Sequence, residues 1–234
     1  MPLRHAPGVP DPTLRPADGL WALLVFLGLA VALDVLLPLP RSLAHATPEG
    51  LVTLYAATVA AEGGAVALVL ARHGRLRAFL AAHYSWHRRS VSVGVLWGLG
   101  LSLLATALTE AERPWLPIHS NNPFVADPAT AHLPLAILAA LILLITVGAP
   151  LAEEALFRGL LFGGWRVRWG FWPAAIGSAL LFGLAHGQAA LLVPLATVGL
   201  GLATLAARSG SLWPSTAAHA TFNLVAIVAA LGFR

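Results

Sequence analysis

The sequence predicts an all-α membrane protein, a polytopic transmembrane helix bundle of about seven to eight helices. Three properties predict this class: 58% of the 234 residues are hydrophobic, only 10% are charged, and the mean hydropathy is +0.80. Soluble domains carry about 25% charged residues, so this chain has too few polar side chains to cover a water-facing surface. The apolar excess must therefore face lipid.

Long apolar runs divide the chain into membrane spans. The hydrocarbon core is about 30 Å thick and a helix rises about 1.5 Å per residue, so a span needs roughly 20 apolar residues. Seven runs meet or approach this length: Leu20–Leu37, Leu51–Ala71, Val91–Thr109, His132–Phe162, Phe171–His186, Ala189–Ala207 and Leu212–Phe233. The fourth is long enough to tilt or project before a turn near Gly163, the fifth is short, and an eighth span stays open.

The N-terminal residues differ in composition from the spans. Residues 1–19 are rich in proline and charge, which predicts a disordered cytoplasmic arm before a single transmembrane domain over 20–234. The alternative is a signal peptide, because Ala44-His45-Ala46 is similar to a cleavage site. The first run is longer than the roughly 7–15 apolar residues of such a peptide, so we expect it to remain as a span.

The arginines predict the orientation, because positive residues concentrate in cytoplasmic loops. With the N-terminus inside, the inner segments hold ten arginines: Arg4, Arg15, Arg72, Arg75, Arg77, Arg88, Arg89, Arg166, Arg168 and Arg208. The outer segments hold three: Arg41, Arg113 and Arg234. This spread argues against nucleic-acid binding despite the net charge of +4. We expect a multi-pass protein of the cell membrane with a cytoplasmic N-terminus, and the arginine-only, Ala/Leu-rich composition favours a bacterial inner membrane.

Ionisable side chains inside spans are candidates for function, because each costs about 2.5–3.5 kcal/mol to insert. The set is Asp34, Glu62, Glu153, Glu154, Arg158, His186 and His219, with Asn223 as a polar companion. Asp34 and Glu62 are single acids without a motif, and we leave both out of the predicted site.

Two glutamates and an arginine share the fourth span. Glu154 and Arg158 are four residues apart, which favours an ion pair on one helix face. Glu153 then points about 100° away, remains without this cation, and is available as a general base. The competing interpretation ends the span near Ala152 and makes the three residues a solvated juxtamembrane turn.

Two histidines follow on later spans, each four residues from a companion: Phe182 with His186, and His219 with Asn223. A single histidine on an apolar helix is more commonly a core residue than a catalyst. Counted along the helices, however, Glu153, His186 and His219 lie roughly 15, 20 and 10 Å from the same side. This convergence predicts an active site that opens toward the cytoplasm.

The motifs Glu-Glu-x-x-x-Arg, Phe-x-x-x-His and His-x-x-x-Asn thus follow one another on successive membrane segments, over about residues 133–225. The pattern resembles the type II CAAX prenyl endopeptidase family. This is the CPBP or Abi family of intramembrane proteases, which includes proteins linked to bacteriocin processing and immunity. Each motif alone is unspecific, but all three match in order and spacing.

The resemblance implies an intramembrane endopeptidase that hydrolyses a peptide bond with a glutamate-activated water. Glu153 is then the general base, and His186 holds or polarises the water. His219 and Asn223 stabilise the oxyanion, a contribution of a few kcal/mol in a water-poor cavity. The structural ion pair completes the catalytic candidates: Glu154 and Arg158.

A zinc mechanism stays open as an alternative. His186, His219 and Glu153 would supply three ligands, with water as the fourth. The sequence has no His-Glu-x-x-His motif, and the family has been described both as metalloproteases and as glutamate proteases. We favour metal-independent hydrolysis without a cofactor. The lack of cysteine excludes a thiolate ligand or nucleophile.

Other functions stay open as well. An ion-coupled transporter would use the intramembrane acids as a path, although the chain has no internal repeat. A non-catalytic immunity or scaffold protein would keep the fold without turnover. A serine protease using Ser209 or Ser211 lacks the Gly-x-Ser-x-Gly context. The expected partners are the lipid bilayer and a peptide, bacteriocin precursor or membrane-protein substrate; prenylated CAAX proteins are the reference substrates of eukaryotic members.

Overall fold

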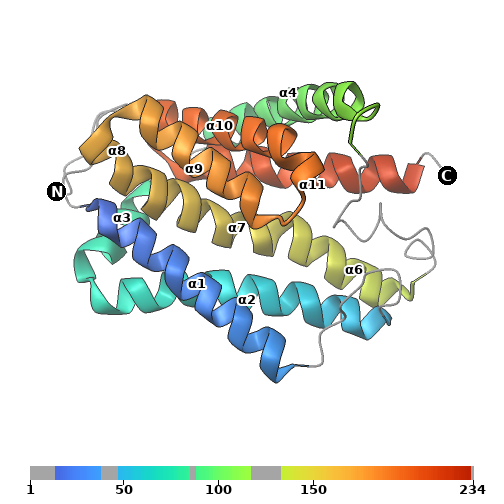
Figure 1. Ribbon diagram of the computed structural model, residues 1–234, viewed down its shortest axis with the longest axis horizontal. Helices are drawn as coiled ribbons and strands as arrows, with labels where there is room; N and C mark the ends of the chain where they lie inside the picture. The colour runs from blue at the N-terminus through green and yellow to red at the C-terminus, as the bar shows by residue number, and fades with distance from the viewer. Residues whose placement is uncertain (1–13, 38–46, 85–87, 117–132, 233–234) are drawn as a thin grey trace.

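The computed structural model describes residues 14–37, 47–84, 88–116 and 133–232, and these residues form helices and no strands (Figure 1). The Ala44-His45-Ala46 segment and residues 1–13 of the predicted arm lie outside them. The elements in order are α1 (Pro16–Leu36), α2 (Pro48–Arg72), α3 (Gly74–His83), α4 (Arg88–Glu112), α6 (Leu135–Leu143), η3 (Leu144–Gly148), α7 (Ala149–Glu153), η4 (Glu154–Phe162), α8 (Gly163–Trp169), α9 (Phe171–Ala185), η5 (Ala189–Leu191), α10 (Leu192–Ser209) and α11 (Leu212–Gly232).

Six helices in the described part of the chain are long and apolar enough to cross a membrane: Pro16–Leu36, Pro48–Arg72, Val91–Glu112, Leu135–Trp169, Ala189–Ser209 and Leu212–Gly232. The fifth predicted run, Phe171–His186, forms α9, an apolar helix of 15 residues. The prediction of an all-α polytopic bundle is confirmed. The structure adds α3, which has ten residues and is too short to span.

The first helix begins earlier than expected. α1 starts at Pro16, so the last four residues of the predicted disordered arm are helical. Proline at the first helical position lacks only an N–H that would have no partner there. The Asp18 carboxylate accepts the Arg15 backbone N–H at 2.8 Å, which closes the helix start.

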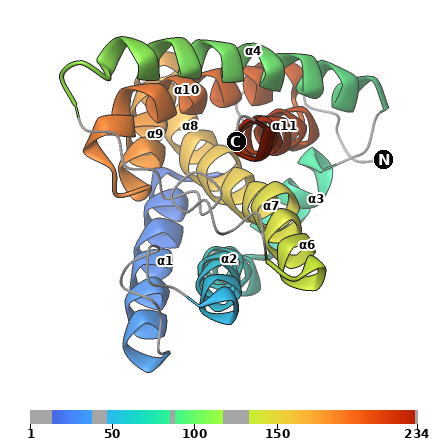
Figure 2. The ribbon, with the colours of Figure 1, turned by 90° about the vertical axis from the view of Figure 1, so that its right-hand side faces the viewer.

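The fourth span is longer than expected. No turn occurs near Gly163; the helix continues through α8 to Trp169 and ends at Gly170, whose φ of +79° suits glycine. The resulting 35-residue helix, Leu135–Trp169, runs through the centre of the molecule. Figure 2 shows it between α1 and α2 on one side and the layer of α4, α9, α10 and α11 on the other.

Two segments of this central helix, η3 and η4, are π-helical, with hydrogen bonds from residue i+5 to residue i. Pro150 gives η3 a cause, because proline has no N–H and its ring clashes with the carbonyl four residues earlier. In the π register the Ala149 N–H bonds to the Leu144 carbonyl. The Ile145 carbonyl would then pair with position 150, where no N–H exists, so it needs another donor.

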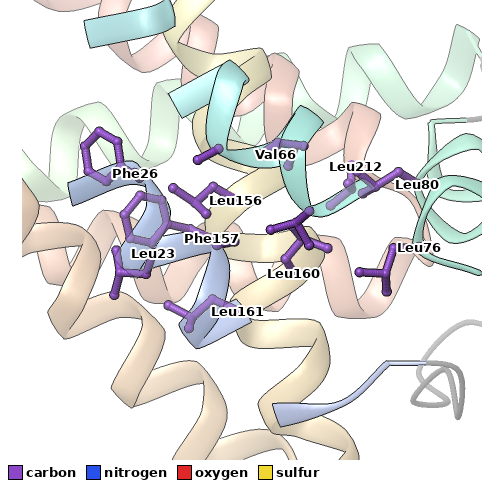
Figure 3. Packing of buried hydrophobic residues seen from close by; sticks show 14 of the residues in the cluster. Leu23, Phe26, Val66, Leu76, Leu80, Leu156, Phe157, Leu160, Leu161 and Leu212 are labelled. Atoms are coloured by element: carbon purple, nitrogen blue, oxygen red, sulfur yellow. The ribbon is translucent and has the colours of Figure 1, made fainter. Parts of the chain in front are cut away.

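Apolar side chains surround η4 on several sides (Figure 3). Leu156, Phe157 and Leu160 are at most 1% exposed. Their cluster contains neighbours from α1, α2, α3 and α11: Leu23, Phe26, Val66, Leu76, Leu80 and Leu212. Close packing of this kind, more than the hydrophobic effect, holds helices together in lipid. It fixes the segment that begins with Glu154.

A close helix pair places α11. A Cβ added to Gly94 of α4 would lie 2.4 Å from the Pro214 carbonyl oxygen, and one added to Gly98 would lie 2.4 Å from the Ala218 carbonyl oxygen. Only glycine allows such an approach, as is usual where membrane helices contact backbone to backbone. Because Ala218 precedes His219, α4 sets the position of that histidine.

Candidate active site

His219 lies between the two adjacent glutamates of the central helix. Its Nδ1 is 3.1 Å from Glu154 Oε1, and its Nε2 is 3.8 Å from Glu153 Oε2. The three residues are buried, with exposed fractions of 2% for His219, 9% for Glu153 and 0% for Glu154. The glutamates do point in different directions, as expected from the helix, but toward the two nitrogens of one ring. Since a carboxylate only accepts hydrogen bonds, Nδ1 carries a proton in its bond to Glu154.

The predicted ion pair is confirmed. Arg158 Nη1 lies 2.9 Å from Glu154 Oε1, with both side chains almost fully buried. Arg158 Nη2 also donates to the Gly199 carbonyl of α10 at 3.2 Å. The juxtamembrane-turn interpretation is therefore wrong, because Glu153, Glu154 and Arg158 are all inside the bundle.

Phe182 connects the arginine to both histidines. Its ring makes edge contacts with Phe157, His186 and His219, at centroid distances of 5.3, 4.9 and 5.5 Å. The Arg158 guanidinium carbon lies 4.2 Å from the centre of the same ring, which adds a cation–π contact. The phenylalanine of the second motif is thus a packing centre, a role that its spacing from His186 does not reveal.

His186 ends α9 and is half-buried. Its Nδ1 is 2.8 Å from the Phe182 carbonyl oxygen, which fixes the ring at the helix terminus. The structure therefore places His186 against Phe182, with His219 on another side of that phenylalanine.

Asn223 faces the π-helical segment. Its Nδ2 donates to the Ile145 carbonyl at 2.8 Å, and this is the carbonyl that Pro150 leaves without a backbone donor. The amide group has two N–H bonds, so this contact uses one of them. Asn223 therefore stabilises the turn before Glu153, a task that the sequence motif does not indicate.

Glu62 of α2 joins this region, although sequence patterns do not point to it. It is 5% exposed, and its carboxylate interacts electrostatically with that of Glu153. The one feature of the sequence that could have pointed to Glu62 is that it is an acidic residue within an apolar run. Asp34, the other single acid, is on the exposed side of α1.

Tyr84 was also not predicted. Its hydroxyl donates to the Leu151 carbonyl at 3.1 Å, and its own backbone carbonyl accepts from Trp213 Nε1. Nearby, Ser211 Oγ donates to the His83 carbonyl at 2.9 Å. The segment after α3 thus ties the start of α11 to α7, two residues before Glu153.

The alternative zinc site would use Nε2 of both histidines, because Nδ1 of His186 faces the Phe182 carbonyl and Nδ1 of His219 faces Glu154. Across the residues that the structure describes, no three His, Asp or Glu side chains form a group that could hold a metal ion. His186, His219 and Glu153 therefore do not form a ligand set in this structure, and we derive no step through a metal.

Residues 135–225 match a family model described as Type II CAAX prenyl endopeptidase Rce1-like. An uncharacterized 24.3 kDa protein of Escherichia coli is 32% identical over 157 residues, which are 58% of this chain and 68% of that protein. YdiL of Bacillus subtilis (strain 168), named as a candidate membrane peptidase, is 29% identical over 88 residues, which are 38% of this chain and 36% of that protein. No solved structure matches.

Fold and site together define a multi-pass membrane protein of a peptidase family. The chain belongs to the Rce1-like family of type II CAAX prenyl endopeptidases, as the resemblance predicts. The matched segment contains every predicted site residue and ends before the last turns of α11. Helices α1 and α2, with Glu62, lie outside it.

Proposed function

We propose that the protein is an intramembrane endopeptidase in which Glu153 activates the attacking water. One observation carries the proposal: the two adjacent carboxylates differ in their partners. Glu154 is neutralised by Arg158 and bound by His219. Glu153 Oε2 has no hydrogen-bond donor among the described residues and lies near His219 Nε2. A buried carboxylate that has neither an arginine partner nor a hydrogen-bond donor is suited to accept a proton.

The chemistry follows from this division of roles. Glu153 removes a proton from a water molecule, and the water oxygen forms a bond to the carbon of the peptide carbonyl. The π electrons of the carbonyl move to its oxygen, which gives a tetrahedral oxyanion. When the intermediate collapses, the C–N bond breaks and the leaving nitrogen takes the proton from Glu153. The carboxylate is restored, so one water is consumed and no other co-reactant is needed.

His219 and Asn223 are the proposed stabilisers of the oxyanion, with His186 orienting the water. The Glu154 carboxylate holds the Nδ1 proton of His219 and fixes the orientation of the ring. In this orientation Nε2 faces the side where Glu153 lies, and as an oxyanion donor it would carry a hydrogen there. Fixed donors at a developing negative charge are worth about 2.7–4 kcal/mol each. Asn223 would contribute its second N–H.

The substrate class is a peptide or a membrane protein. No metal or other cofactor takes part in the proposed steps. We place the N-terminus and α3 in the cytoplasm, following the arginine distribution. The relatives from Escherichia coli and Bacillus subtilis are bacterial proteins, which supports the cell membrane of a bacterium as the location.

The test compares peptides from the membranes and medium of cells that produce the wild type, Glu153→Gln or no protein. We expect cleavage products that depend on the wild type and fall by about 10²–10⁴-fold in Glu153→Gln, because general-base catalysis contributes about that much. The matched control is Asp34→Asn, an acid on the exposed side of α1, which should cleave normally.

Two results would reject the proposal. Unchanged products in a folded Glu153→Gln variant would exclude this glutamate as the base. If products from wild-type cells never differ from those of cells without the protein, the non-catalytic alternative would hold instead. Folding is checked by size-exclusion chromatography in detergent for each variant.

A further inference from the structure

Helix α2 lies along the central helix in the same direction, packed against η3, α7 and η4 (Figure 1). Val59 marks the register, because its Cγ1 is 3.3 Å from where a Cβ on Gly148 would lie. Glu62 is three residues further along α2, and Glu153 is five residues further along the central helix. Both glutamates therefore lie about one to one and a half helical turns beyond the same contact, at a similar height along the packed helices. The charge of Glu153 acts on the Glu62 carboxyl at this height.

The two carboxylates share a water-poor environment. Glu62 is 5% exposed and Glu153 is 9% exposed. In each, Oε2 is buried and has no hydrogen-bond partner among the described residues. Each would therefore lack a donor if both were ionised, and an unpaired buried acceptor is costly.

The charges nearby do not allow both acids to be ionised at low cost. Arg158, the buried cation of this region, is already paired with Glu154. Two neighbouring carboxylates without separate cations disfavour double ionisation, and one proton is then held between them. Glu153 lies near His219 Nε2. The neighbouring charge for Glu62 is that of Glu153.

We propose that Glu62 is a protonated positioning residue whose O–H donates a hydrogen bond to the Glu153 carboxylate. Its catalytic consequence rests on the proposed function. The bond satisfies both unpartnered oxygens, keeps one negative charge on the pair, and holds the carboxylate of Glu153 in the orientation needed to take a proton from water. Glu62 acts through Glu153 and does not itself contact the substrate. The proton stays on Glu62 throughout the cycle.

Two substitutions at Glu62 show whether the site needs a hydrogen-bond donor at this position, a charge, or only the volume of the side chain. Glu62→Gln keeps a donor of the same shape without ionisation, and we expect its kcat to stay within about tenfold of the wild type. Glu62→Leu keeps the volume but removes the donor. We expect kcat to fall by about 10²-fold with KM unchanged, as for a misplaced catalytic group. The Leu variant should fold at least as well, since it removes a buried polar group.

A second measurement does not depend on catalysis. The infrared spectrum of the full-length wild type in detergent should contain a protonated carboxyl C=O band that shifts in D2O. The band should vanish in Glu62→Gln and persist in Asp34→Asn, the control acid on α1. The infrared comparison shows whether Glu62 holds a proton even if the chain cleaves no peptide. Failure of the proposed function is therefore distinguishable from failure of this inference.

Three outcomes would overturn the proposal. The carboxyl band could be unaffected by Glu62→Gln, which would place the proton elsewhere. Glu62→Gln could lose as much kcat as Glu62→Leu, which would mean that an ionised carboxylate is required. Glu62→Leu could keep full kcat, which would leave Glu62 without a positioning role. If the Leu variant does not fold, the infrared comparison of Glu62→Gln with the wild type still decides.

Discussion

A single imidazole ring joins the two glutamates of the candidate site. His219 meets Glu154 through Nδ1 and faces Glu153 through Nε2. Glu154 therefore has two partners, since Arg158 also binds it. Loss of Glu154 would leave a buried cation unpaired and would also release the His219 ring. Stability and catalysis are thus linked at this residue, and they can be separated by changing both members of the ion pair.

The first prediction concerns this ion pair. Arg158→Met should lower the free energy of unfolding by about 3–5 kcal/mol, because it leaves a buried carboxylate without its cation. Glu154→Gln combined with Arg158→Met should recover most of that loss, since no unpaired charge remains. The double variant should stay inactive, because Gln no longer holds His219 by a charged bond. Thermal unfolding in detergent and peptide cleavage are the two measurements.

A surface ion pair gives the control. Arg113 Nη2 lies 2.6 Å from Glu110 Oε1, but both side chains are exposed. Arg113→Met should therefore change the free energy of unfolding by less than about 1 kcal/mol. A double variant of the buried pair that is as unstable as Arg158→Met alone would show that the lost contacts of Arg158 with Gly199 and Phe182, not its charge, cause the effect.

Sequence spacing predicted the part of the site that lies within single helices. Glu154 and Arg158 are one turn apart, and their ion pair follows from that spacing alone. Glu62 and Tyr84 could not be found in this way, because their partners lie on other helices far along the chain. Their positions depend on the packing register between helices, which a pattern within one helix does not contain.

At the level of the elements, composition predicted which runs become helices but not where they end. Lipid requires every backbone group to be paired within the segment, so an apolar run of sufficient length becomes a helix. The ends depend on single residues, such as Pro16 at the start of α1 and Gly170 after α8. The π-helical turn before Pro150 was not predicted either. It leaves the Ile145 carbonyl without a backbone donor, and the donor that replaces it, Asn223, comes from α11, far along the chain.

The close contact between α4 and α11 can be tested by adding a methyl group between the two helices. Gly98→Ala should reduce stability by about 1–3 kcal/mol, because its methyl group would meet the Ala218 carbonyl and force the helices apart. Cleavage should fall further than stability alone explains, since His219 moves with Ala218. Thermal unfolding and kcat of the remaining folded protein would be measured together.

Gly100 on the same helix is the matched control. A Cβ at this position meets no atom within 4 Å, so Gly100→Ala should be neutral or stabilising by up to about 1 kcal/mol. Equal effects of Gly98→Ala and Gly100→Ala would contradict the role given to the close contact, because helix propensity is the same for both.

For the whole molecule, the proposed orientation can be tested directly because the chain has no cysteine. A single introduced cysteine is therefore the only thiol. Arg77→Cys, on the exposed side of α3, should be protected from a membrane-impermeant maleimide in intact cells and react after lysis. Glu110→Cys, exposed near the C-terminal end of α4 and therefore far from α3, should react in intact cells. The opposite pattern would reverse the orientation.

The central helix and α9 differ greatly in length although they pack together. At about 1.5 Å per residue, the 35-residue helix Leu135–Trp169 is roughly 50 Å long, while the 15 residues of α9 reach only about 22 Å. The first exceeds the hydrocarbon core of about 30 Å and the second falls short of it. A helix this short is matched to the membrane by local thinning of the bilayer or by flanking side chains that reach to the interface. We therefore expect His186, at the end of α9, to lie nearer to headgroups and water than a residue in the middle of the central helix.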